Sequence, residues 1–245
     1  MRISDRVSLV GSGALGFQIS DPMDCNVFIL DGGAECALVD AGSGVEPERI
    51  VENAERSGVS IERVKHLLLT HVHGDHAAGA RFFHDRFGLD VTCPAEAAPW
   101  LERGDTEKTS LDAAKAAGIY PQDVVFDPCP VRSPVREDDV VRVGHLELRV
   151  IETPGHSRGH VGYLWTQDGS PSLFSGDSIF AGGRVVLQNI WDCSIQDYAD
   201  TTRKLNGLRL ERLYPGHGPF LLSRAYRHIE QAHARFEDLG VPPNL

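Results

Sequence analysis

The sequence lacks any apolar run that approaches the roughly 20 consecutive residues needed to span a bilayer. Its first six residues, Met1–Arg6, turn polar where a signal peptide would need a continuous apolar stretch. We therefore predict a protein that makes no membrane association and that is located in the cytoplasm.

Paired cysteines are also missing. The five cysteines are an odd number, they are widely spaced, and no Cys-x-x-Cys occurs. A chain of this length without secretion is not expected to depend on a disulfide framework. We expect reduced thiols that pack as small apolar side chains.

Positive charge is scarce. Lys and Arg number 24 against 35 Asp and Glu, which gives a formal net charge of −11. A nucleic-acid groove needs a concentrated positive surface, and the densest basic stretch, 203–212, is interrupted by Glu211. We predict a small-molecule substrate and no nucleic-acid partner; the oligomeric state stays open, with a homo-oligomer as one option.

Short apolar runs and amphipathic segments alternate along the chain. Strands are predicted over 7–10, 26–30, 36–39, 67–70, 146–150, 161–165, 172–175 and 210–214. Helices are predicted over 46–57, 80–87, 107–117, 198–205 and 225–236. This order predicts two sheets with helices outside them, in a single domain over residues 1–245. The proline-rich segment at about 104–138 reads as an inserted, cap-like excursion.

The sequence His71-Val72-His73-Gly74-Asp75-His76 places four ligand-type side chains within six residues. In an extended loop His71 and His73 point the same way, so both can bind one ion, while Asp75 and His76 can turn toward a second. Imidazole and carboxylate suit zinc and similar first-row metals. The motif therefore predicts a metal site.

Three more ligand-type residues each follow a predicted strand: His156, Asp177 and His217. Loops at strand ends are where sites are usually built. The remaining histidines are scattered and are assigned to the surface or to packing: His66, His84, His145, His228 and His233. His160 lies close to a ligand loop and is retained as a candidate support or substrate-contacting group.

Five motifs resemble the metallo-β-lactamase superfamily. They are, in chain order, Leu38-Val39-Asp40-Ala41-Gly42, Thr70-His71-Val72-His73-Gly74-Asp75-His76, Thr153-Pro154-Gly155-His156-Ser157, Ser175-Gly176-Asp177-Ser178 and Pro215-Gly216-His217-Gly218. The resemblance spans about residues 10–220. It implies a four-layer αββα sandwich of two mixed β-sheets with helices on the outer faces.

The resemblance also implies how the ligands divide. One metal would take His71, His73 and His156, and the other Asp75, His76 and His217. Asp177 would bridge both, and Asp75 and Asp177 would be the catalytic carboxylates. Asp40 would help to position the ligand loop. The cofactors would be two divalent ions, with zinc expected and iron or manganese as alternatives.

The activity that follows is that of a dinuclear metal-dependent hydrolase, in which a metal-bridging hydroxide attacks the carbonyl of a small ester, thioester or lactone. Class B β-lactamases usually have Cys or Ser where this chain has Asp177, which argues against β-lactam hydrolysis. RNA-processing members would be expected to show a basic surface or an added RNA-binding part. Glyoxalase II enzymes add a C-terminal helical domain, whereas the 28 residues after His217 suffice for one helix. Acyl-homoserine lactonases of this fold have Tyr where Phe180 stands.

A member of the fold that binds metal without catalysis is one alternative, and two others are enzymes. One is a mononuclear iron dioxygenase acting on persulfides, although its usual Gly-Arg-Thr-Asp segment is not matched at 182–185. The other is a phosphodiester hydrolase of the same fold. We expect the segments 104–138 and 178–193 to form the substrate pocket. Its candidate residues are Phe180 and Trp191 as apolar walls, Arg184 as an anion anchor, and His160.

Overall fold

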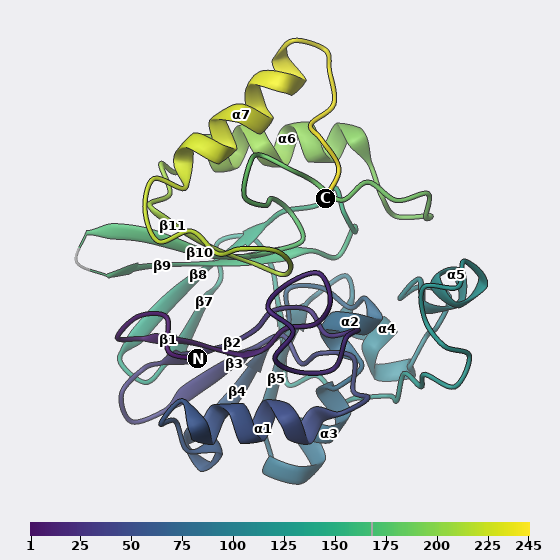
Figure 1. Cartoon of the computed structure of the whole chain (residues 1–245), viewed down its shortest axis with the longest axis vertical. Helices are drawn as coiled ribbons and strands as arrows, with labels where there is room; N and C mark the ends of the chain where they lie inside the picture. The colour runs from purple at the N-terminus through teal and green to yellow at the C-terminus, as the bar shows by residue number, and fades with distance from the viewer. Residues whose placement is uncertain (168) are drawn as a thin grey trace. The chain divides into compact units, whose positions relative to one another are not determined.

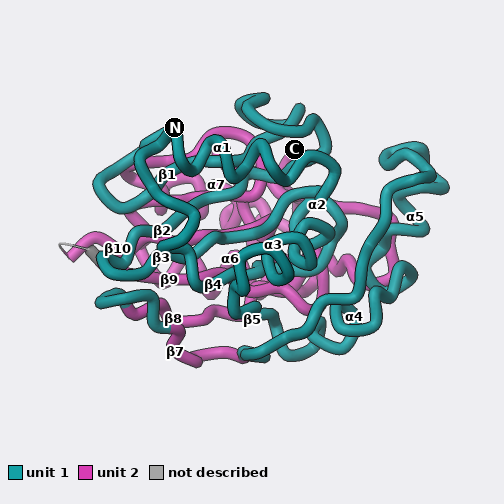
Figure 2. Tube along the Cα trace, turned by 90° about the horizontal axis from the view of Figure 1, so that it is seen from below, with its two compact units in different colours: residues 1–135, 142–146 teal, residues 136–141, 147–245 magenta. Residues whose placement is uncertain are grey.

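The computed structural model describes residues 1–167 and 169–245 (Figure 1). The backbone divides into two compact units, which Figure 2 colours separately. The first comprises residues 1–135 and 142–146, and the second residues 136–141 and 147–245.

The first unit contains a mixed six-stranded sheet whose strands lie in chain order. They are β1 (Val7–Gly11), β2 (Val27–Asp31), β3 (Cys36–Val39), β4 (Val64–Leu68), β5 (Asp90–Pro94) and β6 (Ser133–Val135). β1, β2 and β3 pair antiparallel, whereas β3 to β6 run parallel. Parallel neighbours end at the same edge of a sheet, where open α/β sheets carry their ligands. The loops that follow β3 and β4 therefore start side by side.

Helices of the first unit present one apolar face to this sheet. They are α1 (Pro47–Arg56), α2 (Gly74–Ala77), α3 (Ala80–Phe87), α4 (Ala98–Arg103) and α5 (Leu111–Ala116), with a 3₁₀ turn η1 (Ile61–Arg63). Pro47 suits the first turn of α1, and Gly88 ends α3 in the left-handed conformation (φ 67). Ile50 of α1 and Phe83 of α3 are fully buried in the same apolar cluster as Leu38 of β3. Burial of this face holds the helices against the sheet.

The second unit is built mainly on a mixed five-stranded sheet with the order β11-β10-β9-β8-β7. Its elements are β7 (Val140–Val143), β8 (Leu146–Glu152), β9 (Val161–Gln167), β10 (Ser170–Gly176), β11 (Arg212–Pro215), α6 (Ile195–Asn206) and α7 (Tyr226–Glu237). β8, β9 and β10 are antiparallel neighbours, and β11 is parallel to β10. Tyr198 and Leu205 of α6 and Ile229 of α7 are buried in one cluster with Leu173 of β10.

The two mixed sheets with their helices confirm the predicted α/β class. The strand predicted over 67–70 is offset, because β4 ends at Leu68 and the N–H of Thr70 is bonded by the Asp40 side chain. The helix predicted over 107–117 is confined to Leu111–Ala116, since Ser110 has a positive φ of 58° that a helix cannot contain.

The segment at 104–138 is more than a surface excursion. It supplies β6 to the first sheet, and Phe126 and Cys129 are buried in the first unit's core. Its cap-like role stays a prediction. All five cysteines are free thiols, and only Cys193 is not fully buried. Within the described ranges, no helix has both the length and the apolar character that crossing a bilayer requires.

Candidate metal centre

The first group of ligand-type side chains lies in the loop after β4. His73 has extended backbone (φ −67, ψ 155), and α2 begins at the next residue, so Asp75 and His76 stand on its first turn. The ring centroids of His71 and His73 are 4.7 Å apart, and those of His71 and His76 are 4.1 Å apart. The loop therefore gathers three imidazoles and adds a carboxylate beside them.

A buried carboxylate, Asp40, fixes the orientation of this loop. It follows β3 with a positive φ of 60° and is 2% exposed. Its Oδ1 accepts the backbone N–H of Thr70 at 2.8 Å, and its Oδ2 lies 2.9 Å from both Thr70 Oγ1 and His76 Nδ1. A carboxylate only accepts hydrogen bonds. Thr70 and His76 must therefore both donate to it, which agrees with a positioning role for Asp40.

The same carboxylate reaches His71 through Thr70. Thr70 Oγ1 lies 3.1 Å from His71 Nδ1, and the single hydroxyl proton is directed to Asp40. The hydroxyl oxygen therefore accepts from the Nδ1–H of His71. In neutral imidazoles, His71 and His76 then both carry their proton on Nδ1 and present the lone pair of Nε2, as metal-ligating histidines require.

Asp75 is held by a residue far along the chain, Tyr120. The phenol donates to Asp75 Oδ1 at 2.8 Å and accepts the backbone N–H of Asp75 at 3.0 Å. The other carboxylate oxygen, Oδ2, lies 3.5 Å from His76 Nε2. Burial, and then the Asp75 carboxylate, raise the pKa of Tyr120 well above its usual range, so the phenol keeps its proton.

The second group lies in the second unit, where His156, Asp177 and His217 follow β8, β10 and β11. β10 and β11 are parallel, and Gly216 N–H bonds the carbonyl of Gly176 at 2.8 Å, so their end loops meet. Asp177 Oδ2 lies 3.6 Å from His156 Nε2 and 3.4 Å from His217 Nε2. Two imidazole nitrogens thus converge on one carboxylate oxygen.

Backbone groups orient this second set. His156 Nδ1 lies 3.1 Å from the carbonyl oxygen of Val186, which can only accept, so the ring's Nε2 carries the lone pair. Tyr198 Oη lies 3.0 Å from the carbonyl oxygens of both Asp177 and Val186. Burial, and then Asp177, raise the pKa of Tyr198 well above its usual range. One phenol therefore joins Asp177 to Val186, the residue that orients His156.

His160 is placed behind Asp177. Its Nε2 accepts the backbone N–H of Asp177 at 3.0 Å, and its Nδ1 lies 2.8 Å from Thr153 Oγ1. His160 is 1% exposed. Because Nε2 accepts the backbone N–H, the neutral ring carries its proton on Nδ1 and donates it to the threonine hydroxyl. The structure gives His160 a support contact with Asp177; direct contact with the substrate stays a prediction.

Each group by itself fits divalent-metal coordination. In a tetrahedral site with bonds of about 2.0–2.1 Å, neighbouring ligand atoms are roughly 3.4 Å apart. Three pairs of ligand-type atoms within the units, at 3.4, 3.5 and 3.6 Å, have that spacing. Neutral imidazole and carboxylate are the ligands that zinc and similar ions take in enzymes.

The predicted pocket residues of the second unit differ in exposure. Phe180 is fully buried, and its ring centroid lies 6.3 Å from that of His217. Arg184 donates through Nη1 to the carbonyl of Asn244 at 2.9 Å, and Trp191 is 43% exposed. Their roles toward a substrate stay predictions.

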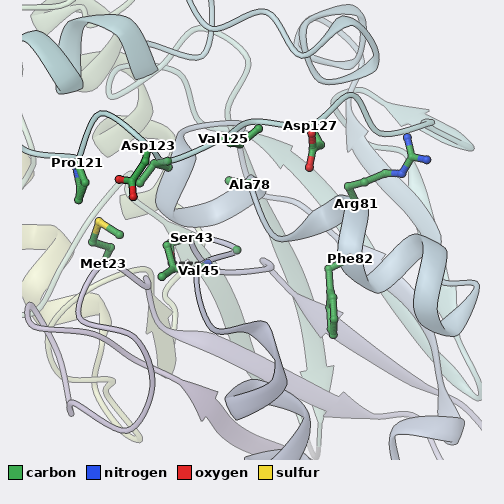
Figure 3. A pocket seen from close by; sticks show the side chains of 12 residues that line it. Met23, Ser43, Val45, Ala78, Arg81, Phe82, Pro121, Asp123, Val125 and Asp127 are labelled. Carbon is green, nitrogen blue, oxygen red and sulfur yellow. Dashed lines mark hydrogen bonds between the residues drawn. The ribbon is translucent and has the colours of Figure 1, made fainter.

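A separate hollow of about 390 Å³ lies on the first unit (Figure 3). It is lined by the loop 43–45, the start of α3 and the segment 121–127, with Met23. Asp123 and Asp127 make it acidic, and the guanidinium of Arg81 is bonded to Asp85 and to the carbonyl of Pro128. None of the predicted ligands lines it.

Sequence reasoning did not identify the two tyrosines, Tyr120 and Tyr198, as part of the site. Tyr198 is the first residue of the helix predicted over 198–205, and Tyr120 stands in a proline-rich segment with no motif around it. Cys25 was also treated only as a packing residue, yet its sulfur, an Asp40 oxygen and a His76 nitrogen lie within 4.8 Å of one another. Burial raises the pKa of this thiol strongly, so it remains a neutral packing group.

Comparison with known proteins agrees with this geometry. The family model of the Metallo-beta-lactamase superfamily matches residues 20–217. A hydroxyacylglutathione hydrolase of Chelativorans sp. (strain BNC1) is 34% identical over 182 residues, covering 74% of this chain and 56% of that protein. A beta-lactamase-like protein 2 homolog of Caenorhabditis elegans is 28% identical over 196 residues, covering 80% and 56%. The chain spans about half the length of these curated relatives.

Solved structures show the fold. BJP-1, a subclass B3 metallo-beta-lactamase of Bradyrhizobium japonicum, superposes with a TM-score of 0.71 at 22% identity, covering 90% of this chain and 88% of its own. A metallo-beta-lactamase of Cronobacter sakazakii gives 0.74 at 19% identity, covering 98% and 96%. Because the family model covers most of the chain and the motifs lie at its strand ends, this chain belongs to the metallo-beta-lactamase superfamily.

Proposed function

We propose that the chain is a metal-dependent hydrolase in which the two ligand groups together hold two divalent ions. The observation that carries the proposal is the protonation pattern of the imidazoles. His71, His76 and His156 each have Nδ1 bonded to an acceptor of the protein, so in the neutral ring Nε2 is the nitrogen that carries the lone pair a metal requires. Histidines that serve only in packing have no need of this common arrangement.

The proposed division of ligands follows the family pattern. His71, His73 and His156 would hold one ion, and Asp75, His76 and His217 the other. Asp177 would bridge the two, which is supported by the approach of both His156 and His217 to its Oδ2. Zinc suits these donors, and iron or manganese are the alternatives.

Two divalent ions, when bound, supply an activated water at neutral pH and polarise the oxygen that gains charge in the reaction. The protein's own residues set the charge of the centre and hold the ligand side chains in place. Asp75 and Asp177 offset only part of the cationic charge, so the centre still attracts a carbonyl oxygen or an anion. Asp40, Tyr198 and His160 hold the ligands by buried hydrogen bonds, which limits their movement during turnover.

The proposed substrate is a small ester, thioester or lactone, and a thioester is favoured. Among the relatives, the names hydroxyacylglutathione hydrolase and atrochrysone carboxyl ACP thioesterase both denote thioester cleavage. The second, from Aspergillus fumigatus, is 25% identical over 197 residues and is covered over 37% of its length. Trp191, which is 43% exposed, is the proposed apolar wall for the acyl part, and Arg184 is the proposed anchor for an anionic group. Phe180 is fully buried beside His217, so it is not part of the proposed pocket wall.

A hydrolysis screen on protein of known metal content tests the proposal. Thioesters of glutathione, simple acyl thioesters, lactones, phosphodiesters and β-lactams would be compared, with Asp177→Asn as the inactive control. We expect thioester cleavage by protein that holds two zinc equivalents. If only phosphodiesters are cleaved, the proposed substrate class is wrong and the protein is a phosphodiester hydrolase. If the protein binds a single iron and consumes oxygen on persulfides, the proposed reaction is wrong and the protein is an oxygenase.

A further inference from the structure

Tyr120 contacts the ligand loop in three ways. Its hydroxyl donates to Asp75 Oδ1 at 2.8 Å and accepts the backbone N–H of the same residue at 3.0 Å. Its ring lies against Gly74, because a Cβ at that glycine would be 3.4 Å from Tyr120 Cε2. A single side chain thus holds both the backbone and the carboxylate of one proposed ligand.

These contacts decide which oxygen Asp75 can offer. Oδ1 is engaged by the phenol, whereas Oδ2 faces His76 Nε2 at 3.5 Å, a separation that suits two ligands of one ion. Without the phenol, the carboxylate could rotate about its last bond and present either oxygen. The hydroxyl therefore restricts Asp75 to one orientation before any ion binds.

The segment that carries Tyr120 is tied to the ligand loop at a second point. Leu111 of α5 also lies beside Gly74, with its Cδ1 3.5 Å from a Cβ at that position. Leu111 is buried, and Lys115 and Gln122 exchange hydrogen bonds between side chain and backbone on either side of Tyr120. These contacts fix the segment 111–122, and with it the position of Tyr120.

We propose that Tyr120 is a positioning residue for Asp75, and that it sets the affinity of the ion held by Asp75 and His76. This inference rests on the proposed metal-ligand role of Asp75. Groups that orient metal ligands typically contribute about 10- to 100-fold to metal affinity. Tyr120 acts through Asp75 and has no direct part in the reaction.

The test is a zinc titration of metal-free protein in competition with a chromophoric chelator. Wild type, Tyr120→Phe and Tyr226→Phe are compared; Tyr226 is the control, since its ring packs under the Arg209 guanidinium at 4.1 Å in the second unit. Phenylalanine keeps the ring against Gly74 and removes only the hydroxyl. We expect Tyr120→Phe to weaken one zinc equivalent by about 10- to 100-fold and to leave the other unchanged, with Tyr226→Phe behaving as wild type.

A double-mutant cycle separates positioning from general support of the fold. In an Asp75→Ala background, Tyr120→Phe should cause no further loss of zinc affinity, because the group through which it acts is gone. Two results would overturn the inference: unchanged affinity of every bound equivalent in Tyr120→Phe, or an equal loss in the Asp75→Ala background. Failure of the wild type to hydrolyse any thioester while binding two ions would instead reject the proposed reaction, and the zinc result would stand.

Discussion

Asp40→Asn isolates the effect of one buried carboxylate on a metal ligand. Asparagine has nearly the same shape and tolerates the positive φ of 60° at this position, so the backbone should be retained. Its carbonyl oxygen can still accept the N–H of Thr70. Its amide nitrogen, however, would replace Oδ2, to which Thr70 Oγ1 and His76 Nδ1 now donate.

The size of the effect follows from that exchange. An amide N–H facing His76 Nδ1 favours the tautomer with the proton on Nε2, which cannot bind a metal through that nitrogen. In the variant the competent tautomer loses its hydrogen bond to a charged acceptor, which is worth about 1.5–3 kcal/mol. At about 1.4 kcal/mol per tenfold change, the ion held by His76 should bind roughly 10- to 150-fold more weakly.

Zinc competition titrations of metal-free protein measure this directly. Asp138→Asn is the matched control, since Asp138 also has a positive φ, of 65°, but ion-pairs with Arg149 at the surface of the second unit. Near-wild-type zinc affinity in Asp40→Asn, with the fold retained, would refute the tautomer argument. A comparable loss in Asp138→Asn would show that the change in charge, and not the contact with His76, is responsible.

Three further outcomes are expected. Asp177→Ala should abolish turnover and lower bound metal, whereas His233→Ala should match wild type in kcat/KM. If activity is lost in His233→Ala and kept in Asp177→Ala, the assigned roles are wrong. Burial raises the pKa of Asp24 above its ordinary value of 3.8, so the folded state binds this proton more tightly than the unfolded chain does. Wild type should therefore lose stability relative to Asp24→Asn as the pH rises from 3.8 through the raised pKa of the folded state. Urea unfolding at several pH values checks this, and a stability difference that does not change with pH would contradict it. Trp191→Ala should raise KM for larger acyl groups with metal content unchanged, and KM values that match wild type for every acyl group would remove Trp191 from the pocket.

The strand-end positions of the ligand motifs were predictable because they depend on local patterns. An apolar run followed by His71-x-His73-x-Asp75-His76 predicts a buried strand that ends in a ligand loop, and β4 with α2 has that form. Asp40 was implied by family resemblance alone. Its partners followed only from the parallel pairing of β3 with β4, which brings its carboxylate to Thr70.

The supporting tyrosines could not be predicted, because their contacts join segments distant in sequence. Tyr120 is 45 residues from Asp75, and Tyr198 is 21 residues from Asp177. Neither has a periodic pattern or a motif that indicates its partner. The pairing depends on where the chain returns after β5 and after β10, which is a property of the sheet topology.

In the proposed metal centre, hydrogen bonds run from Asp40 through Thr70 to His71, with a branch to His76, and they affect how the protein takes up its ions. Side chains already ordered by their own protein surroundings lose little conformational entropy when an ion arrives. Metal uptake is then weakly coupled to folding, unlike in zinc fingers, which are unfolded without their ion. The ion found in such a centre reflects which metals are available when the folded protein meets them, so its composition can change with growth conditions while the protein remains intact.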